Sequence, residues 1–207
     1  MLFDDREEAG KKLAEAIERR GIKPDLVLSI PRGGLPIGRE VADTLDVPLD
    51  IVVARKIGSP QNPELAIGAV SSDGTCWLNE DVIEREKIDD DFIQESIEKE
   101  TKNAKQKMKN IRKGQKYPVI EGKKILVVDD GIATGSTMIA CLNHLRNLEA
   151  ESITVAVPVG PKDIKDTLQN EADNVIILET PEYFGSVGSH YKDFTQVKEF
   201  EARNILN

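Results

Sequence analysis

The sequence predicts an α/β fold, with a central, mostly parallel sheet flanked by helices. In the second half of the chain, short apolar runs alternate with segments of helical spacing, at 124–128, 136–148, 152–158, 162–169 and 174–178. This alternation is typical of βαβ units, whose strands pair in parallel. The 207 residues, 39% of them hydrophobic, suffice for one sizeable core. We therefore expect a single domain over residues 1–207.

The first half of the chain supplies the remaining elements. Its apolar residues recur either at helical spacing or in short runs of strand length. One segment between them is rich in Gly and Pro and is expected to form a loop. In order, we expect a helix at 4–20, a strand at 25–30, a helix at 36–45, a strand at 49–54 and the loop at 57–65.

Two segments are expected to lie outside the alternating pattern. Residues 65–70 and 76–78 have strand composition around a turn, and residues 80–113 are mostly helical. They predict a hairpin and helix insertion over residues 65–113. Residues 180–195 follow the last strand and hold four aromatic residues in a chain that is only 4% aromatic. They are expected to form a separate C-terminal segment, here called the hood, a feature that the family resemblance described below implies.

Composition excludes several classes of function. The net charge of −9 argues against broad nucleic-acid binding, which depends on a positive surface. With two cysteines, two histidines and no Cys-x-x-Cys pair, a zinc cluster is not expected. No signal peptide or membrane-length apolar run is visible, so we expect a cytoplasmic protein with reduced thiols and no membrane partner.

The most informative segment is VVDDGIATGST at 127–137, between a predicted strand and a predicted helix. Gly131 and Gly135 allow a tight turn and close approach of the backbone to a ligand. Thr134, Ser136 and Thr137 supply hydroxyl groups at the helix N-terminus, where free N–H groups favour an anion. These features predict a phosphate pocket. Neither the Gly-Lys-Ser/Thr of a nucleoside-triphosphate loop nor the Gly-x-Gly-x-x-Gly of a dinucleotide site is present.

Two carboxylates, Asp129 and Asp130, stand immediately before this loop. Because carboxylates repel phosphate, their natural partners are hydroxyl donors. A phosphate at one end and a diol at the other describe ribose 5-phosphate.

The segment resembles the 5-phosphoribosyl 1-pyrophosphate (PRPP) signature of the type I phosphoribosyltransferases, and the resemblance extends over residues 25–195. It implies that Asp129 and Asp130 bind the ribose 2- and 3-hydroxyls. It also implies that the following loop surrounds the 5-phosphate. The ribose 5-phosphate site would then comprise Asp129, Asp130, Gly131, Ile132, Ala133, Thr134, Gly135, Ser136 and Thr137.

The resemblance also places a pyrophosphate site. In the family, an early strand ends in a short loop that binds pyrophosphate through backbone amides, and Arg32, Gly33 and Gly34 stand there. Arg55 and Lys56, after the next strand, would neutralise the departing pyrophosphate. The Gly- and Pro-rich residues that follow suit a closing lid. The blocks Pro-Arg-Gly-Gly and Arg-Lys-x-Gly-x-Pro-x-Asn-Pro-Glu are similar to those of a less characterised subgroup.

The implied reaction is transfer of the phosphoribosyl group to a nitrogenous base or similar acceptor. The resemblance implies Mg²⁺, bound mainly by water and substrate oxygens, with Asp129 and Asp130 orienting its waters and no direct protein ligand. In 6-oxopurine members an aspartate faces the acceptor where this chain has Ala133, which argues against hypoxanthine or guanine as acceptor. Glu64, in the predicted lid, is a candidate proton acceptor alongside the catalytic cations Arg55 and Lys56.

The hood is the candidate acceptor site. Phe184 or Tyr191 would stack on a flat base, and Asp193 would accept from an exocyclic amine. The resemblance further implies a homodimer. The main alternative is a regulatory protein of the same fold that senses PRPP or a nucleotide without turnover. A phosphatase or receiver domain using the acid pair is weaker, because it does not explain Thr134 to Thr137.

Overall fold

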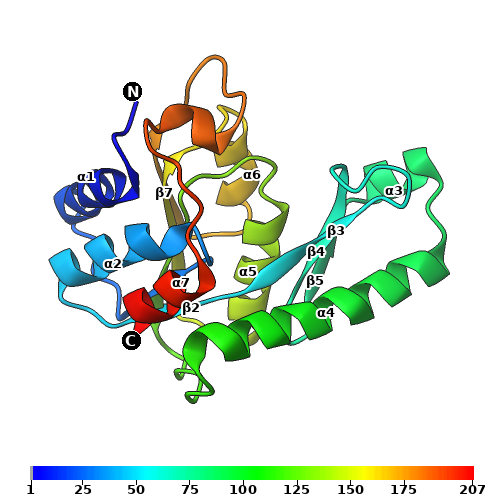
Figure 1. Cartoon of the computed structure of the whole chain (residues 1–207), viewed down its shortest axis with the longest axis horizontal. Coiled ribbons are helices and arrows are strands. Elements are labelled where there is room, and N and C mark those ends of the chain that lie inside the picture. The colour runs from blue at the N-terminus through cyan, green and yellow to red at the C-terminus, as the bar shows by residue number, and fades with distance from the viewer. Residues whose placement is uncertain (1) are drawn as a thin grey trace.

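The computed structural model describes residues 2–207. Helices and strands alternate through most of the chain (Figure 1). In chain order the elements are α1 (Arg6–Arg19), β1 (Leu26–Ser29), α2 (Gly34–Leu45), β2 (Leu49–Ile51), β3 (Ala54–Gly58), β4 (Ala66–Ser71), β5 (Cys76–Leu78), α3 (Glu80–Glu86), α4 (Asp90–Arg112), β6 (Lys124–Val128), α5 (Ser136–Asn147), β7 (Ser152–Val159), α6 (Ile164–Gln169), β8 (Asn174–Glu179), the 3-10 helix η1 (Val187–His190) and α7 (Glu199–Leu206).

The central sheet has five strands in the order β2-β1-β6-β7-β8. Every neighbouring pair in it is parallel, and Ser29 at the end of β1 lies beside Val128 at the end of β6. The α/β fold predicted from the alternating second half is therefore confirmed. The chain reverses its direction of winding between β1 and β6, which places the carboxyl ends of these two strands at a topological switch point.

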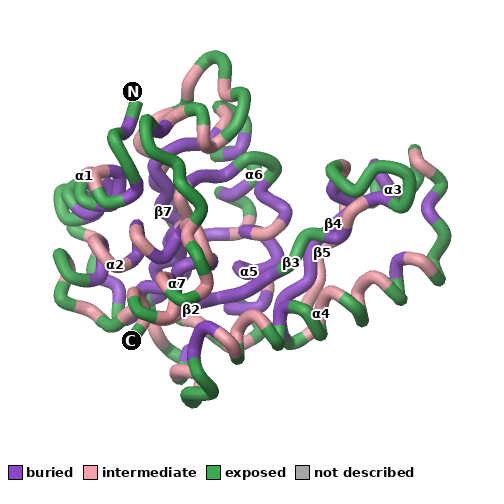
Figure 2. The backbone as a smooth tube through the Cα atoms, in the orientation of Figure 1, coloured by how far each residue is buried: buried purple, intermediate pink, exposed green. Residues whose placement is uncertain are grey.

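The two faces of the sheet are covered by different helices. Successive strand residues point to opposite faces. Leu126 and Val128 belong to the core under α1 and α2, whereas Ile125 and Val127 belong to the core under α5 and α6. Figure 2 shows the resulting buried strands between more exposed helical surfaces. None of the helices within residues 2–207 combines the length and apolar character needed to cross a membrane.

Elements β3, β4, β5, α3 and α4 form an arm that projects from the core (Figure 1). The three strands make an antiparallel sheet of their own, in the order β3-β4-β5. The arm begins at Ala54, earlier than the expected residue 65, because the predicted strand at 49–54 is divided. Its first part, β2, joins the central sheet, and the chain then enters β3 of the arm. The long helix α4 runs from the tip of the arm back to the core.

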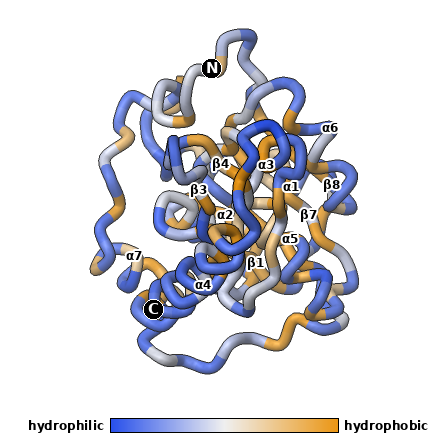
Figure 3. The backbone as a smooth tube through the Cα atoms, turned by 90° about the vertical axis from the view of Figure 1, so that its right-hand side faces the viewer, coloured by the Kyte–Doolittle hydropathy of each residue, from blue (hydrophilic) through white to orange (hydrophobic). Residues whose placement is uncertain are grey.

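The C-terminal segment returns to the core. Within the hood, the Phe3 N–H donates to the His190 carbonyl and the Lys192 N–H donates to the Phe3 carbonyl, both over 2.8 Å. The segment then leads to α7, which packs against α2 and α4 and which the sequence analysis did not predict. Figure 3 shows that much of α4 is hydrophilic, in contrast to the hydrophobic strands of the sheet.

Candidate active site

The two predicted acids lie at the carboxyl edge of the central sheet. β6 ends at Val128, so Asp129 and Asp130 follow it directly. Because β1 runs parallel to β6, the loop after it, residues 31–34, emerges at the same edge. A Cβ added at Gly33 would lie 2.0 Å from Asp130 Oδ2. The predicted ribose and pyrophosphate segments are therefore in contact, and glycine is needed where they meet.

The loop between β6 and α5 has the geometry expected of a phosphate cradle. Gly135 has a φ of 79°, in the left-handed region that glycine adopts readily, and it leads directly into α5. The hydroxyl oxygens of Thr134 and Ser136 lie 3.3 Å apart there. The first turn of α5 has no acidic residue, so no carboxylate in it opposes an anion at the positive helix end. The Ile132 N–H donates to the Val159 carbonyl over 3.0 Å, which anchors the loop to β7.

The remaining loop residues differ in exposure. Gly131 is buried, and a Cβ there would lie 2.6 Å from Val187 Cγ1, so the hood packs on the start of the loop. Ala133 and Thr134 are exposed, and Thr137 is half-buried. The loop is therefore covered at its beginning and open at its turn.

Asp130 is held by residues from both ends of the chain. Arg6, the first residue of α1, contacts Asp130 Oδ2 through Nε at 2.9 Å and Nη2 at 2.8 Å. The Tyr191 hydroxyl donates to the Asp130 carbonyl over 2.6 Å. Arg6 is itself fixed, because Nη1 donates to the Thr195 carbonyl over 2.8 Å and the guanidinium lies 3.9 Å from the centroid of the Phe194 ring. These contacts fix the position of Asp130, which is predicted to bind a ribose hydroxyl.

Burial raises the pKa of both carboxyls. The pKa of Asp129 lies well above the ordinary aspartate value because of burial and the negative charge of Asp130, with Lys107 and Arg6 opposing the shift. Burial also raises the pKa of Asp130, and Arg6 opposes it. The Asp130 N–H donates to Asp129 Oδ1 over 2.8 Å. Two adjacent carboxylates in this setting are costly to keep ionised unless a cation or hydroxyl donors contact them.

A polar cavity of about 450 Å³, here called the basic cavity, opens beside the 31–34 loop. Arg32 of that loop, Arg55 of β3 and Lys107 of α4 line it. Lys107 Nζ donates over 2.7 Å to the carbonyl of Pro31, whose peptide bond to Arg32 is cis. Burial, together with the charges of Arg55 and Arg32, lowers the pKa of Lys107 to about 8. Three cations therefore lie beside the predicted pyrophosphate loop in a chain of strongly negative net charge.

The structure separates the predicted pair Arg55 and Lys56. Both lie within β3 rather than after it, and consecutive strand residues point to opposite sides. Arg55 lines the basic cavity and pairs with Glu100 at 3.0 Å. Lys56 lines a different cavity, of about 340 Å³, and its Nζ lies 3.3 Å from Glu64 Oε2. Glu64 is 91% exposed, near the end of the segment predicted to form a lid.

The hood residues occupy different environments. The Tyr191 ring is only 6% exposed, with the rings of Phe3 and Phe194 at centroid distances of 5.4 and 5.1 Å. The predicted stacking of a base on Tyr191 is therefore wrong for this structure, because the ring is part of the core. Phe184 is half-buried and stacks on His190. Asp193 is exposed, and hydrogen bonds from Thr195 lower its pKa.

Asp193 also lines a small cavity of about 240 Å³ together with Arg6 and Pro36. This position leaves its carboxylate accessible, as a contact with an acceptor amine requires. Tyr183, which the sequence analysis did not single out, is 89% exposed and is the most exposed large aromatic of the hood. The acceptor roles of Phe184 and Asp193 stay predictions.

The acid pair is the part of the site to be considered for the Mg²⁺ that the resemblance implies. Within residues 2–207, no group of three or more His, Cys, Asp or Glu side chains is placed to hold a metal ion. Asp129 and Asp130 nevertheless offer the hard carboxylate oxygens that Mg²⁺ prefers. They fit an ion that is bound by water and substrate oxygens and whose waters the two carboxylates orient.

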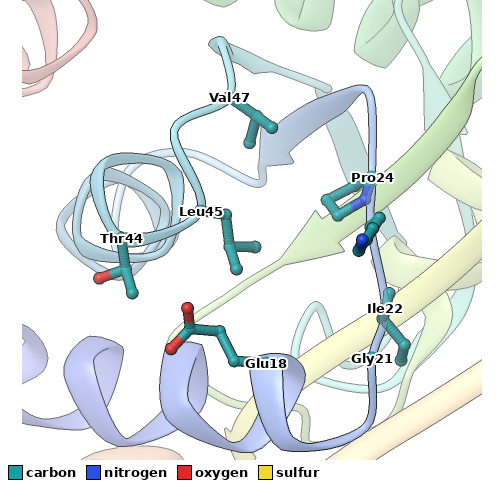
Figure 4. A pocket seen from close by; sticks show the side chains of 8 residues that line it. Glu18, Gly21, Ile22, Pro24, Thr44, Leu45 and Val47 are labelled. Atoms are coloured by element: carbon teal, nitrogen blue, oxygen red, sulfur yellow. The ribbon is translucent and has the colours of Figure 1, made fainter.

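A separate cavity of about 360 Å³ lies away from these residues, between α1 and α2 (Figure 4). Glu18, Leu45 and Val47 line it, together with residues 21–24 that precede β1. It therefore lies at the amino ends of the strands. Ligands of open α/β sheets bind at the opposite, carboxyl edge, where the acid pair stands.

The site predicted from the PRPP resemblance thus combines a glycine-containing turn after a parallel strand, two acids beside it and a cationic cavity next to the neighbouring loop. The family model for the phosphoribosyl transferase domain matches residues 2–192. The chain therefore belongs to the phosphoribosyltransferase family, as the resemblance of the 127–137 segment indicated.

Individual relatives agree with this assignment. Two curated Mycobacterium tuberculosis sequences, from strains H37Rv and CDC 1551, carry the name "putative phosphoribosyl transferase" and are 40% identical over 206 residues. The match covers 100% of this chain and 46% of each of theirs, so the chain spans about half the length of these relatives. The solved structure of TT1426 from Thermus thermophilus has 33% identity and a TM-score of 0.84, covering 100% of this chain and 98% of that one.

A more distant solved structure shares the fold. A hypothetical protein from Neisseria gonorrhoeae, solved with bound ppGpp, has a TM-score of 0.52 and 18% identity, covering 100% of this chain and 97% of that one. At this identity, the likeness shows the fold alone.

Sequence reasoning missed two residues at the site, Arg6 and Lys107. Arg6 is separated from Asp130 by 124 positions and Lys107 from Pro31 by 76. Neither lies in a recognisable motif. A partial signal was present for Lys107, because Asn103, Lys107 and Asn110 have the spacing of one helix face.

Proposed function

We propose that this chain transfers the 5-phosphoribosyl group of PRPP to a nitrogenous base or a similar ring acceptor and releases pyrophosphate. The observation that carries the proposal is the contact between two segments far apart in the sequence. The Asp129–Asp130 pair and the 31–34 loop meet at the sheet edge, between the phosphate cradle and the basic cavity. PRPP has the matching order of groups: a 5-phosphate, a ribose diol and a pyrophosphate.

In the proposed reaction, the bond between ribose C1 and the pyrophosphate oxygen breaks, and a bond from C1 to the acceptor nitrogen forms. The electron pair of the broken bond leaves with pyrophosphate, and the acceptor nitrogen loses a proton. Asp129 and Asp130 would hold the hydroxyls, and Arg32 and Arg55 would stabilise the leaving group's charge. Positioning and electrostatic stabilisation supply most of the catalysis in this scheme.

Mg²⁺, when bound with the substrate, would add positive charge at the pyrophosphate, and the two aspartates would orient its waters. The donor chemistry of the acid pair supports this part of the proposal. For the acceptor's proton, Glu64 is the candidate base. Its exposed carboxylate, in the segment after β3, would leave Lys56 Nζ and approach the site when that segment closes.

The experiment is a measurement of pyrophosphate release. The protein is incubated with PRPP, Mg²⁺ and a pool of purines, pyrimidines and other ring acceptors, and release is compared with and without the pool. We expect acceptor-dependent release by the wild type and its loss in an Asp129→Asn/Asp130→Asn variant. Dividing the pool then identifies the acceptor.

The folding of the Asp129→Asn/Asp130→Asn variant must be checked, because Asp130→Asn removes the charge that faces Arg6. Asp129→Asn alone leaves that ion pair in place and serves as the second variant. Release that survives in both folded variants would contradict the proposed ribose site. PRPP binding without release for any acceptor would contradict turnover and favour the sensor alternative.

The proposal includes a homodimer in the cytoplasm, as the family resemblance implies. Both cysteines are free, Cys141 buried and Cys76 half-buried, which fits a reducing compartment. Light scattering at several protein concentrations tests the dimer, and a single monomeric mass would contradict it.

A further inference from the structure

The insertion arm contributes one wall of the basic cavity. Asn103, Gln106, Lys107 and Asn110 of α4 all line it, at helical spacings of three and four. Much of the rest of α4 is charged and exposed, whereas this face carries one lysine among three amides. Gln106 Nε2 donates to Asn110 Oδ1 over 2.6 Å, which orders part of the face. Amide N–H groups around a cation form a surface suited to an anion.

Lys107 is a half-buried cation of the cavity. Its ammonium touches the Pro31 carbonyl at 2.7 Å, and it lies close enough to Asp129 to lower the pKa of that carboxyl. Lys107 therefore stands between the pyrophosphate loop and the acid pair. The nearby charges of Arg32 and Arg55, together with burial, disfavour its charged form. Holding three cations together is unfavourable unless an anion joins them.

The cavity contains one carboxylate-bearing residue, Glu199 at the start of α7, which is ion-paired with Arg203. Glu100, which holds Arg55, belongs to the neighbouring cavity lining. The charge facing the cavity is thus mainly positive, although the chain carries −9. An anion with more than one charge fits this arrangement.

We propose that Lys107 is a direct pyrophosphate ligand, so that the insertion arm, through α4, forms part of the substrate site. This inference rests on the proposed function and adds to it a contact that neither the PRPP signature nor the 31–34 loop contains. The amides of Asn103 and Gln106 extend the same surface outward. In this arrangement, pyrophosphate bridges the core and the arm.

The test is calorimetric titration of inorganic pyrophosphate with Mg²⁺ into four proteins: wild type, Lys107→Gln, Lys107→Met and Lys105→Gln. Lys105 lies on the same helix but is exposed and lines none of the cavities described, so its variant is a control for loss of one charge. Because a charge-assisted hydrogen bond is lost, we expect Lys107→Gln to weaken binding about 10- to 100-fold. The Lys105→Gln affinity should stay within about twofold of wild type, as expected for an exposed charge.

The two Lys107 variants separate ligand binding from loop support. Gln keeps an N–H that can donate to the Pro31 carbonyl, whereas Met removes both the donor and the charge. Weak binding by both variants is expected for a direct ligand. Wild-type affinity in Lys107→Gln, with loss only in Lys107→Met, would reduce Lys107 to a support of the loop and overturn the inference.

The outcomes also separate this inference from the proposed function. If the wild type binds pyrophosphate and Lys107→Gln binds it equally well, only the role of Lys107 fails. If the wild type releases no pyrophosphate from PRPP and also binds no pyrophosphate, both the proposed function and the role of Lys107 fail. Thermal unfolding of all four proteins shows whether any loss of binding reflects loss of the fold.

Discussion

The ion pair between Arg6 and Asp130 gives a prediction with a calculable size. Arg6→Met removes the guanidinium but retains a long apolar side chain. The two side chains are only 10% and 14% exposed, so Asp130 would remain largely buried without its cation. Removing one partner of a buried pair costs about 3–5 kcal/mol, and residual exposure favours the lower end. At about 2–4 °C per kcal/mol for a chain of this size, the midpoint of thermal unfolding should fall by roughly 6–12 °C.

The dependence on pH identifies the cause. Burial raises the folded-state pKa of Asp130, and Arg6 opposes that shift, so Arg6→Met should raise the pKa further. A carboxyl whose folded pKa is raised favours the folded state below its unfolded pKa of about 3.9, and this stability is lost as pH rises through the folded value. The variant's deficit should therefore shrink as the pH is lowered through the raised pKa of Asp130.

A double-mutant cycle provides the decisive assay. Urea unfolding is measured for Arg6→Met, Asp130→Asn and the double variant. Because Asp130→Asn removes the uncompensated charge, the double variant should be more stable than Arg6→Met alone, with a coupling energy of about 1 kcal/mol or more. Additive effects, or a deficit in Arg6→Met that does not change with pH, would refute the reasoning.

Three further predictions can be tested on single variants or on the wild type. Gly33→Ala places a Cβ 2.0 Å from Asp130 Oδ2, and the displaced carboxylate should weaken PRPP binding about 10- to 100-fold by calorimetry; unchanged affinity would count against the contact. Because burial raises the pKa of Asp129, PRPP affinity should fall as pH is lowered from about 8 to about 5, and a flat profile would contradict its role as a hydroxyl acceptor. Burial raises the pKa of Cys141, so a thiol reagent should modify only Cys76 in the native protein; two fast-reacting thiols would show that the α5 face is open.

Local patterns in the sequence predicted several strands of both sheets well. Strands β5 and β6 have the predicted limits, because each is a short apolar run bounded by turn residues. The acid pair and the glycine-containing turn before α5 were predictable as local structure for a similar reason, since their residues are contiguous. The roles proposed for them depend on one strand, one turn and one helix.

Features set by contacts between distant segments were not predictable. The run at 49–54 has uniform strand composition, yet its two ends join different sheets, and no local signal marks the division. Helix α7 is short and mixed in composition, and it is stabilised by packing on α2 and α4. The burial of Tyr191 depends on Phe3, which pairs with the hood from the other end of the chain.

At the candidate site too, residues in local motifs were predictable, whereas those placed by contacts between distant segments were not. The glycines of the 31–34 loop were recognised, but not the reason for Gly33, which is the carboxylate of Asp130 almost a hundred residues later. Arg6 and Lys107 belong to helices most of whose charged residues face solvent, although Arg112 at the end of α4 is also buried. Only the fold distinguishes these two cations from their neighbours on the same helices.

The proposed function requires that PRPP binds at the carboxyl edge of β6 with its ribose on the Asp129–Asp130 pair. The most direct measurement is calorimetric titration of PRPP with Mg²⁺ into the wild type, Asp129→Asn and Asp129→Asn/Asp130→Asn, each with its unfolding midpoint recorded. We predict binding by the wild type and at least about a tenfold loss of affinity in both folded variants, since each loses a charged hydrogen-bond acceptor. Equal binding by the folded variants, or no binding by the wild type, would contradict the account.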